Sequence, residues 1–216
     1  MNRPGYLVVV TGTATEVGKT FCTATAIAEL RAAGLTVAAR KPLQSFAPNP
    51  DTPELTDAEV LAAATGEDPE TVCAPAGWFA LPMAPPMAGA ALNQPVPTVA
   101  ELVAATHWPV DISVGFVEGV GGPRSPLALD GDTVDLARAL QPDLMVLVAD
   151  AGLGVINAVL LSVAALEECG PLTVLLNRYD PANDLHVANF DWLSECGLDI
   201  VTTPQALAEK IISGRR

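Results

Sequence analysis

The sequence predicts a single α/β domain, residues 1–216, built on a mostly parallel sheet with helices on both faces. Strand-like and helix-like segments alternate along the whole chain, which is typical of such a sheet. The strand-like segments are continuously apolar, as in strands that are buried on both faces. Of the 216 residues, 50% are hydrophobic, which is ample for one core.

The first unit joins a strand, a glycine-bounded loop and a helix. The strand is expected at Tyr6–Val10, and the helix is expected to begin at Lys19 and to continue to about Ala33, where Gly34 stops it. The loop between them, Gly12–Gly18, is followed directly by lysine and threonine. Loop N–H groups and a helix N-terminus can together hold phosphate oxygens.

This order predicts a P-loop NTPase-like fold with a nucleoside-triphosphate site. Lys19 would reach the outer phosphates, and the Thr20 hydroxyl would bind Mg²⁺. The usual spacing places the first glycine of the loop at the position of Thr13, one residue after Gly12, so the loop is of a variant type. The alternative is an ordinary tight turn that Gly12 and Gly18 permit.

Two further strands bring charged residues to the carboxyl edge of the sheet, where open α/β sheets bind ligands. The strand expected at Leu35–Arg40 is followed by Lys41, for which an ordinary surface lysine is the alternative. The strand expected at Ile112–Val117 is followed by Glu118 and then by glycines that let a ligand approach the backbone. Glu118 is therefore a candidate Mg²⁺ ligand, unless it is an exposed acid in a turn.

A loop, a helix and an irregular segment are predicted between these strands. A proline-rich loop is expected at residues 46–56, after which Thr56 would cap a helix at Asp57–Thr65. Asp57 would then either bind metal or only favour the helix dipole. The segment 73–97 is expected to be irregular, either as the wall of an apolar pocket or as packing beneath a long loop.

Two asparagines are candidate functional residues in the second half of the chain. Asn157 lies in the first turn of a predicted helix, which it would cap. Asn177 follows a predicted strand and offers a donor and an acceptor to the edge of a nucleobase, unless it only forms a turn. The remaining strands are expected at Leu144–Ala149, Leu172–Leu176 and Asp199–Val201. The remaining helices are expected at Val99–His107, Thr133–Leu140, Val155–Glu168 and Asp184–Cys196, with a last helix to about Ile212.

In a parallel sheet these polar residues would meet at one edge, and this convergence counts for more than any single motif. The residues that share this placement are Lys19, Thr20, Lys41, Ser45, Glu118 and Asn177.

Composition narrows the class of protein. A formal net charge of −14 argues against a nucleic-acid partner, whose binding surface is basic. No apolar run approaches the roughly 18 residues of a membrane span, and no secretory signal is expected before the first strand. The four cysteines have no CxxC spacing, which favours idle thiols over a zinc site. We therefore expect a soluble cytoplasmic protein without a membrane partner.

Five motifs, taken together, resemble dethiobiotin synthetase over nearly the whole chain. They are GTATEVGKT at 12–20, KPLQS at 41–45, VEGVGG at 117–122, LGVIN at 153–157 and LLN at 175–177. The family's P-loop, G-T-x-T-x-V-G-K-T, has the same displaced glycine. The resemblance implies a ligase of biotin biosynthesis that closes a cyclic urea on 7,8-diaminononanoate (diaminopelargonate) with CO₂ or bicarbonate, ATP and Mg²⁺. It also implies a homodimer whose site is completed across the interface.

The resemblance also implies a role for each matching residue. Lys41 would be catalytic, with Lys19 on the β- and γ-phosphates. Mg²⁺ would be held by Thr20, Asp57 and Glu118, and the substrate by Thr15, Ser45 and Asn157. The nucleotide would be bound by Glu16, Val17, Gly18, Lys19, Thr20, Phe21, Asp57, Glu118, Gly119, Val120, Gly121, Asn177, Arg178, Pro204, Gln205 and Ala206.

The chain departs from the family pattern at a few positions, and other functions stay open. The departures are Ala14, Phe46, Val120, Ala158 and the pair Pro123-Arg124; a ring at position 46 would narrow the carbamate end of the pocket. A cobyrinic acid diamide synthase type of enzyme usually carries an added glutaminase domain. A partitioning-type ATPase carries an extra P-loop lysine, which is absent between Gly12 and Gly18. A degenerate homologue would bind nucleotide without turnover.

Overall fold

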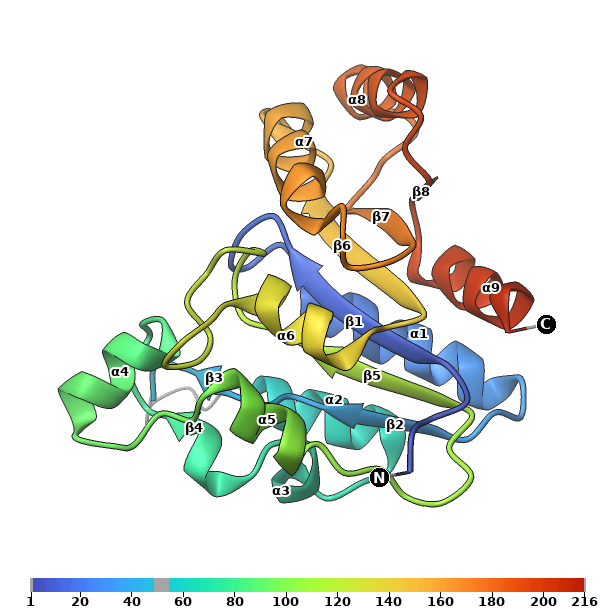
Figure 1. The fold of residues 1–216 in the computed structure, drawn as a ribbon. Coiled ribbons are helices and arrows are strands. Elements are labelled where there is room, and N and C mark those ends of the chain that lie inside the picture. Colours follow the sequence, from blue (N-terminus) through green and yellow to red (C-terminus); the bar gives the residue numbers. More distant parts are fainter. Residues whose placement is uncertain (1, 49–54, 216) are drawn as a thin grey trace.

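The computed structural model describes residues 2–48 and 55–215, so residues 49–54 of the predicted loop at 46–56 lie outside the described residues. Within the described residues, six parallel strands form one sheet in the order β2-β5-β1-β6-β7-β8 (Figure 1). The predicted parallel sheet is therefore confirmed. Its strands are β1 (Leu7–Gly12), β2 (Val37–Arg40), β5 (Val114–Glu118), β6 (Leu144–Asp150), β7 (Leu172–Asn177) and β8 (Ile200–Val201).

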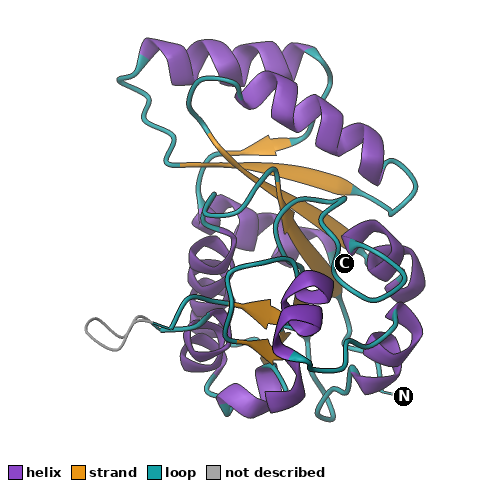
Figure 2. Ribbon diagram, turned by 90° about the vertical axis from the view of Figure 1, so that its left-hand side faces the viewer, coloured by secondary structure: helices purple, strands orange, loops and turns teal. Residues whose placement is uncertain are grey.

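Helices cover both faces of this sheet, because successive strand residues point to opposite sides. Val8 and Val10 pack into one core and Leu7 and Val9 into the other, and all four are buried. This two-sided burial explains why the strands read as continuously apolar. Figure 2 shows the helices on the two sides of the twisted sheet. The first core includes α1 (Lys19–Ala32), α2 (Asp57–Thr65), α3 (Pro69–Val72) and α9 (Pro204–Gly214); the second includes α4 (Pro85–Leu92), α5 (Val99–Ala105), α6 (Thr133–Leu140), α7 (Val155–Leu166) and α8 (Asp184–Glu195).

Strand ends are where the sequence-based bounds differ most, because pairing with neighbours and not local sequence fixes them. The first strand continues past Val10 to Gly12, since its last residues still pair with β6. The third strand begins later than predicted but includes Glu118, which lies opposite Val10. The bounds of α2 and α6, in contrast, are as predicted.

The prediction of an irregular segment at 73–97 is wrong in part. This segment contains a short 3-10 helix (Pro75–Gly77), β4 (Trp78–Phe79) and α4, and β4 pairs in parallel with β3 (Gln44–Ser45) in a separate small sheet. Two-residue strands carry no readable periodicity, and Pro85 stands at the first turn of α4, where proline favours a helix start. In the described part of the chain, no helix is both long and apolar enough to cross a bilayer.

A capping box fixes the start of α2 and with it the position of Asp57. The Thr56 hydroxyl accepts a hydrogen bond from the Glu59 N–H at 3.4 Å, and the Glu59 carboxylate accepts one from the Thr56 N–H at 2.7 Å. The Gln44 side-chain oxygen accepts a third bond, from the Ala58 N–H at 3.0 Å. These bonds satisfy N–H groups that the first helical turn leaves without partners.

We expect Thr56→Ala to lower the free energy of unfolding by about 1 kcal/mol, because the box is broken. Thr98→Ala should cost a similar amount, since Thr98 and Glu101 form the same box at α5. Thr25→Ala, inside α1, is the matched control and should cost little, because alanine has the better helix propensity. Urea unfolding measures all three, and equal losses at positions 25, 56 and 98 would contradict a capping role.

Candidate active site

About half of the predicted site residues line a cavity of about 740 Å³ at the carboxyl edge of the sheet. Its walls come from the loop before α1, the chain after β2, the start of α2 and the loop after β5. The predicted site residues that line it are Thr15, Glu16, Gly18, Lys19, Thr20, Phe21, Lys41, Ser45, Asp57, Val120 and Gly121.

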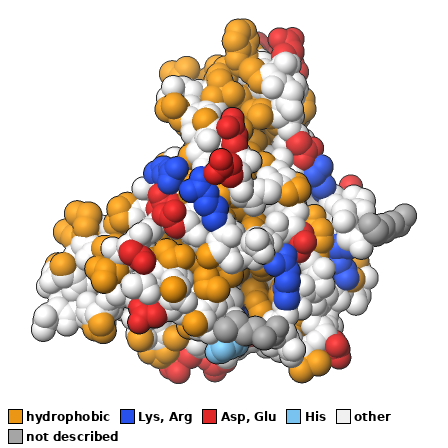
Figure 3. Space-filling model, viewed as in Figure 1, with side chains coloured by type: hydrophobic (Ala, Val, Ile, Leu, Met, Phe, Trp, Pro, Cys, Tyr) orange, Lys and Arg blue, Asp and Glu red, His pale blue; other side chains and the backbone are white. Residues whose placement is uncertain are grey.

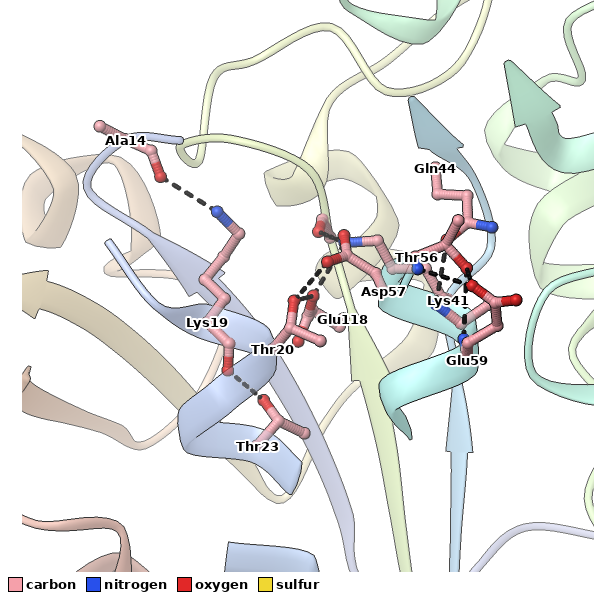
Figure 4. Close-up of polar contacts among 12 residues, drawn as sticks. Ala14, Lys19, Thr20, Thr23, Lys41, Gln44, Thr56, Asp57, Glu59 and Glu118 are labelled. Atoms are coloured by element: carbon pink, nitrogen blue, oxygen red, sulfur yellow. Dashed lines mark hydrogen bonds and ion pairs between the residues drawn. The ribbon is translucent and has the colours of Figure 1, made fainter. Parts of the chain in front are cut away.

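A buried lysine bridges two carboxylates at the floor of this cavity (Figure 4). The Lys41 Nζ lies 2.8 Å from both Asp57 Oδ2 and Glu118 Oε1, and it donates to the Gly119 carbonyl at 2.9 Å. Lys41 is 1% exposed and Glu118 is 0% exposed. Lys41 is therefore not the surface lysine of the alternative interpretation, and Glu118 is not an exposed acid in a turn.

The two carboxylates keep Lys41 charged. Burial alone would lower the pKa of Lys41, but the neighbouring Glu118 and Asp57 outweigh it and hold this pKa above its usual value. Burial would likewise raise the pKa of Asp57, yet the Lys41 ammonium holds it below its usual value. At neutral pH Lys41 and Asp57 are both ionised, so Lys41 is a fixed cation and not a proton acceptor.

Oxygen atoms converge beside this pair in a way that suits Mg²⁺. The Thr20 hydroxyl lies 2.7 Å from Asp57 Oδ1 and 2.8 Å from Glu118 Oε1. The second carboxylate oxygen of Glu118 is buried without a hydrogen-bond partner among the residues described. Hard oxygen ligands of this kind fit Mg²⁺, which usually keeps several waters. The described residues hold no cluster of three or more His, Cys, Asp or Glu side chains that would bind a metal unaided.

The loop before α1 needs both of its glycines. Gly18 has a left-handed backbone (φ 90°), and a Cβ there would lie 2.2 Å from Asn177 Nδ2. A Cβ on Gly12 would lie 2.7 Å from a methyl group of Val17. Lys19 folds back so that its Nζ donates to the Ala14 carbonyl at 3.0 Å. Burial and the nearby Lys41 ammonium lower the pKa of Lys19.

One wall of the cavity is apolar. It includes Phe46, whose ring meets the Trp78 ring edge to face, with centroids 6.2 Å apart. Residues 82–85 line the same wall, so part of the segment 73–97 does bound an apolar pocket. Beside Phe46, the Ser45 hydroxyl is buried and has no hydrogen-bond partner within the described residues. No motif in the sequence singles out residues 82–85 as cavity residues. Nor does any motif indicate that the Gln44 side chain helps to hold the start of α2.

Other predicted site residues lie outside the cavity lining. Asn177 and Arg178 contact the outer side of the loop before α1, where Val17 is buried. Asn157 is exposed on α7 and is not its cap, because the residue at the cap position is Gly154. Gly119 contributes a carbonyl to Lys41 but does not line the cavity, and Pro204, Gln205 and Ala206 begin α9.

Comparisons with known proteins find similar sequences over most of the chain. The family model described as an AAA domain matches residues 7–209. The ATP-dependent dethiobiotin synthetase BioD of Anaeromyxobacter dehalogenans (strain 2CP-C) is 39% identical over 179 residues, covering 81% of this chain and 78% of the relative. BioD of Rhodococcus jostii (strain RHA1) is 36% identical over 213 residues, covering 96% and 89%.

Among solved structures, the signal recognition particle receptor FtsY of Elizabethkingia anophelis matches with a TM-score of 0.52 at 15% identity. That match covers 100% of this chain and 67% of the receptor. At this identity the likeness concerns the fold alone, and it supports a P-loop NTPase-like architecture.

We expect Lys41→Met to lower the free energy of unfolding by about 3–5 kcal/mol, because it leaves the Glu118 carboxylate buried without its cation. Adding Glu118→Gln should recover most of this loss. Lys210→Met is the matched control, since Lys210 pairs with Asp199 at the surface and should contribute less than about 1 kcal/mol. If Lys41→Met cost no more than Lys210→Met in urea unfolding, Lys41 would not form a buried ion pair with Glu118.

Proposed function

The chain belongs to the dethiobiotin synthetase family, and we propose that it catalyses the ATP-dependent closure of a cyclic urea on 7,8-diaminononanoate, as a ligase of biotin biosynthesis. The observation that carries this proposal is the Lys41 ammonium, buried between Asp57 and Glu118 beside a phosphate-binding loop. A triphosphate and an anionic intermediate can meet at this cation. The reaction would consume CO₂ or bicarbonate and release ADP and phosphate.

The triphosphate is assigned to the loop before α1. Its backbone N–H groups, at Glu16 to Phe21, and the Lys19 ammonium are the donors for phosphate oxygens. A polyanion at this position would draw Lys19 away from the Ala14 carbonyl, to which it is bonded here. Burial first and the Lys41 ammonium second lower the pKa of Lys19, and a phosphate between the two lysines would offset both effects.

Charge balance supports a requirement for Mg²⁺. The cluster has no net charge, because the two lysines balance the two carboxylates (Lys19, Lys41, Asp57 and Glu118). It therefore leaves the negative charge of a triphosphate to be balanced by a metal ion. The residues that would hold the ion are Thr20, Asp57 and Glu118, whose oxygen atoms converge. When bound, Mg²⁺ neutralises phosphate charge during phosphoryl transfer.

The proposed chemistry has three steps. One amine of the substrate adds to the carbon of CO₂ and loses a proton, which gives a carbamate. A carbamate oxygen then attacks the γ-phosphorus, and ADP leaves. The second amine attacks the carbonyl carbon of the resulting anhydride, which closes the ring and expels phosphate.

Lys41 is assigned to these steps as a cation that donates hydrogen bonds to carbamate and phosphoryl oxygens. Its pKa lies above the usual value, so it stays protonated and cannot take the proton of the amine. A fixed charge in a buried site stabilises a developing negative charge without reorganising. The hydroxyl groups of Thr15 and Ser45 are assigned to the carbamate end of the substrate.

The apolar wall is assigned to the aliphatic chain of the substrate. Phe46, Met83 and Pro85 present apolar surface to the cavity, which a methylene chain can cover. Phe46 lies against Trp78 and lines the cavity next to Ser45, and we infer that its ring limits the space for the carbamate end of the substrate.

The adenine base and the partner subunit are assigned to regions of the protein and not to single contacts. The edge of the adenine is placed near Asn177, Arg178 and the start of α9 at Pro204–Ala206, with Gly119–Gly121 against the nucleotide. Hydrophobic side chains gather over α7 on the face seen in Figure 3. Leu161 of α7 is 67% exposed, and Leu153, which precedes this helix, is 91% exposed. We assign this surface to a homodimer interface that brings Asn157 to the substrate carboxylate of the partner's site. Such a synthetase would work in the cytoplasm.

Phosphate release tests the function directly. With ATP, Mg²⁺ and bicarbonate present, release should depend on the diamine, and a product with the mass of dethiobiotin should form. Release without the diamine would instead indicate a switch-type ATPase. Nucleotide binding without any release would indicate a degenerate homologue.

We expect Asp57→Asn to raise the Mg²⁺ concentration for half-maximal activity by roughly tenfold or more, because a metal-binding oxygen loses its charge. Asp184→Asn is the matched control: Asp184 is also the first residue of a helix, α8, so it has the same relation to a helix dipole. Its metal titration should not change. An unchanged titration for Asp57→Asn would remove this residue from the metal site and leave it the ion pair with Lys41 and the helix dipole.

A further inference from the structure

Three carbonyl groups of the loop before α1 are held from outside by side chains. The Ala14 carbonyl accepts from Lys19, and the Val17 carbonyl accepts from Asn177 Nδ2 at 2.9 Å. The Glu16 carbonyl accepts from Arg178 Nη2 at 3.1 Å. Asn177 and Arg178 follow each other at the end of β7, so one strand end holds two consecutive carbonyls of the loop.

These contacts determine the direction of the loop N–H groups. The described peptide bonds are all trans, and in a trans peptide the C=O and the following N–H point in opposite directions. With the Glu16 and Val17 carbonyls directed at β7, the N–H groups of Val17 and Gly18 are directed away from it. Among residues 2–48 and 55–215, neither N–H donates a hydrogen bond. Both N–H groups are thus uncommitted within the described chain, and Gly18 lines the cavity in which an anion would bind.

Glu16 needs an external contact of this kind. Its backbone is left-handed, with φ 61°, a conformation that non-glycine residues rarely adopt unless their surroundings hold them there. Glu16 lines the cavity, and its carbonyl is bonded to Arg178. The Arg178 contact therefore stabilises the turn of the loop at Glu16.

Arg178 is itself oriented by an ion pair. Its Nη1 lies 2.6 Å from Asp150 Oδ2, and the other oxygen of Asp150 accepts from the Gly152 N–H at 3.0 Å. Asp150 ends β6 directly beside Asn177 of β7. The guanidinium thus spans from the sheet edge to the loop, which one planar fork of donors can do.

We propose that Arg178 is a positioning residue: held by Asp150, it fixes the Glu16 carbonyl and so directs the loop N–H groups at the polyphosphate. The inference rests on the proposed nucleotide site and assigns Arg178 a role other than contact with the base. Because the effect passes through phosphate-binding groups, it must act alike on every triphosphate, whether or not the ligand carries a base.

Equilibrium binding of ATP, GTP and inorganic triphosphate tests this role. Arg178→Ala should weaken the binding of all three by a similar factor, roughly tenfold or more, the scale of one charge-assisted hydrogen bond. Arg178→Lys keeps the positive charge but lacks the fork, so it should show most of the same loss. Arg138→Ala, which removes an exposed ion pair with Glu168, is the matched control and should bind normally.

The outcomes separate the alternatives. Loss for ATP alone would make Arg178 a contact for the base and overturn the inference. Full binding by Arg178→Lys would reduce the role to general attraction of anions and would also overturn it. Wild-type protein that binds no triphosphate would instead overturn the proposed function.

Hydrogen exchange gives a second readout that needs neither ligand nor activity. The hydrogen-bonded amides at the two ends of the loop, Thr13 N–H to the Val148 carbonyl and Cys22 N–H to the Gly18 carbonyl, should exchange faster in Arg178→Ala than in the wild type, with the rest of the chain unchanged. Arg178 has a 58% exposed side chain, so its truncation spares the core. Should that variant nevertheless fail to fold, Asp150→Asn replaces it, since it releases the guanidinium. Unchanged exchange in the loop would overturn the inference.

Discussion

The structure depends on one buried cation. The Lys41 ammonium is removed from water, and its charge is tolerable only because Asp57 and Glu118 lie 2.8 Å away. This requirement constrains three elements at once: β2 must end directly before the lysine, β5 must end at the glutamate, and α2 must begin at the aspartate. Neighbouring parallel strands satisfy the first two conditions, because β2 pairs with β5. The capping box of α2 satisfies the third.

The same sheet edge organises the loop that faces this cation. The loop leaves β1 at the centre of the sheet, with the Lys41 cluster on the β5 side and Asn177 and Arg178 on the side of β6 and β7. The cluster offers charges of both signs, whereas the contacts at β7 hold carbonyl groups. We infer that anion binding at this edge is divided between fixed charges on one side and fixed backbone dipoles on the other.

The features that could be predicted from the sequence are those that a local sequence signal specifies. The start of α2 was predictable because Thr56 and Glu59 have the spacing of a capping box, and Lys41 and Glu118 could be expected to meet because both follow strands of a parallel sheet. The pairing of β3 with β4 was not predictable, since two-residue strands are defined only by their partner. The contact of Arg178 with the Glu16 carbonyl was not predictable either, because it depends on which way a loop peptide faces. The chemical roles of the site residues stay predictions.

The most direct test of the account follows an oxygen atom. If the carbamate attacks the γ-phosphorus, one oxygen of CO₂ becomes part of the phosphate that the second amine expels. The reaction is therefore run with ¹⁸O-labelled bicarbonate, ATP, Mg²⁺ and the diamine, and the released phosphate is analysed by mass spectrometry. A synthetase should release phosphate with one labelled oxygen, and only when the diamine is present. Unlabelled phosphate would mean that water attacks ATP, and this would contradict a synthetase.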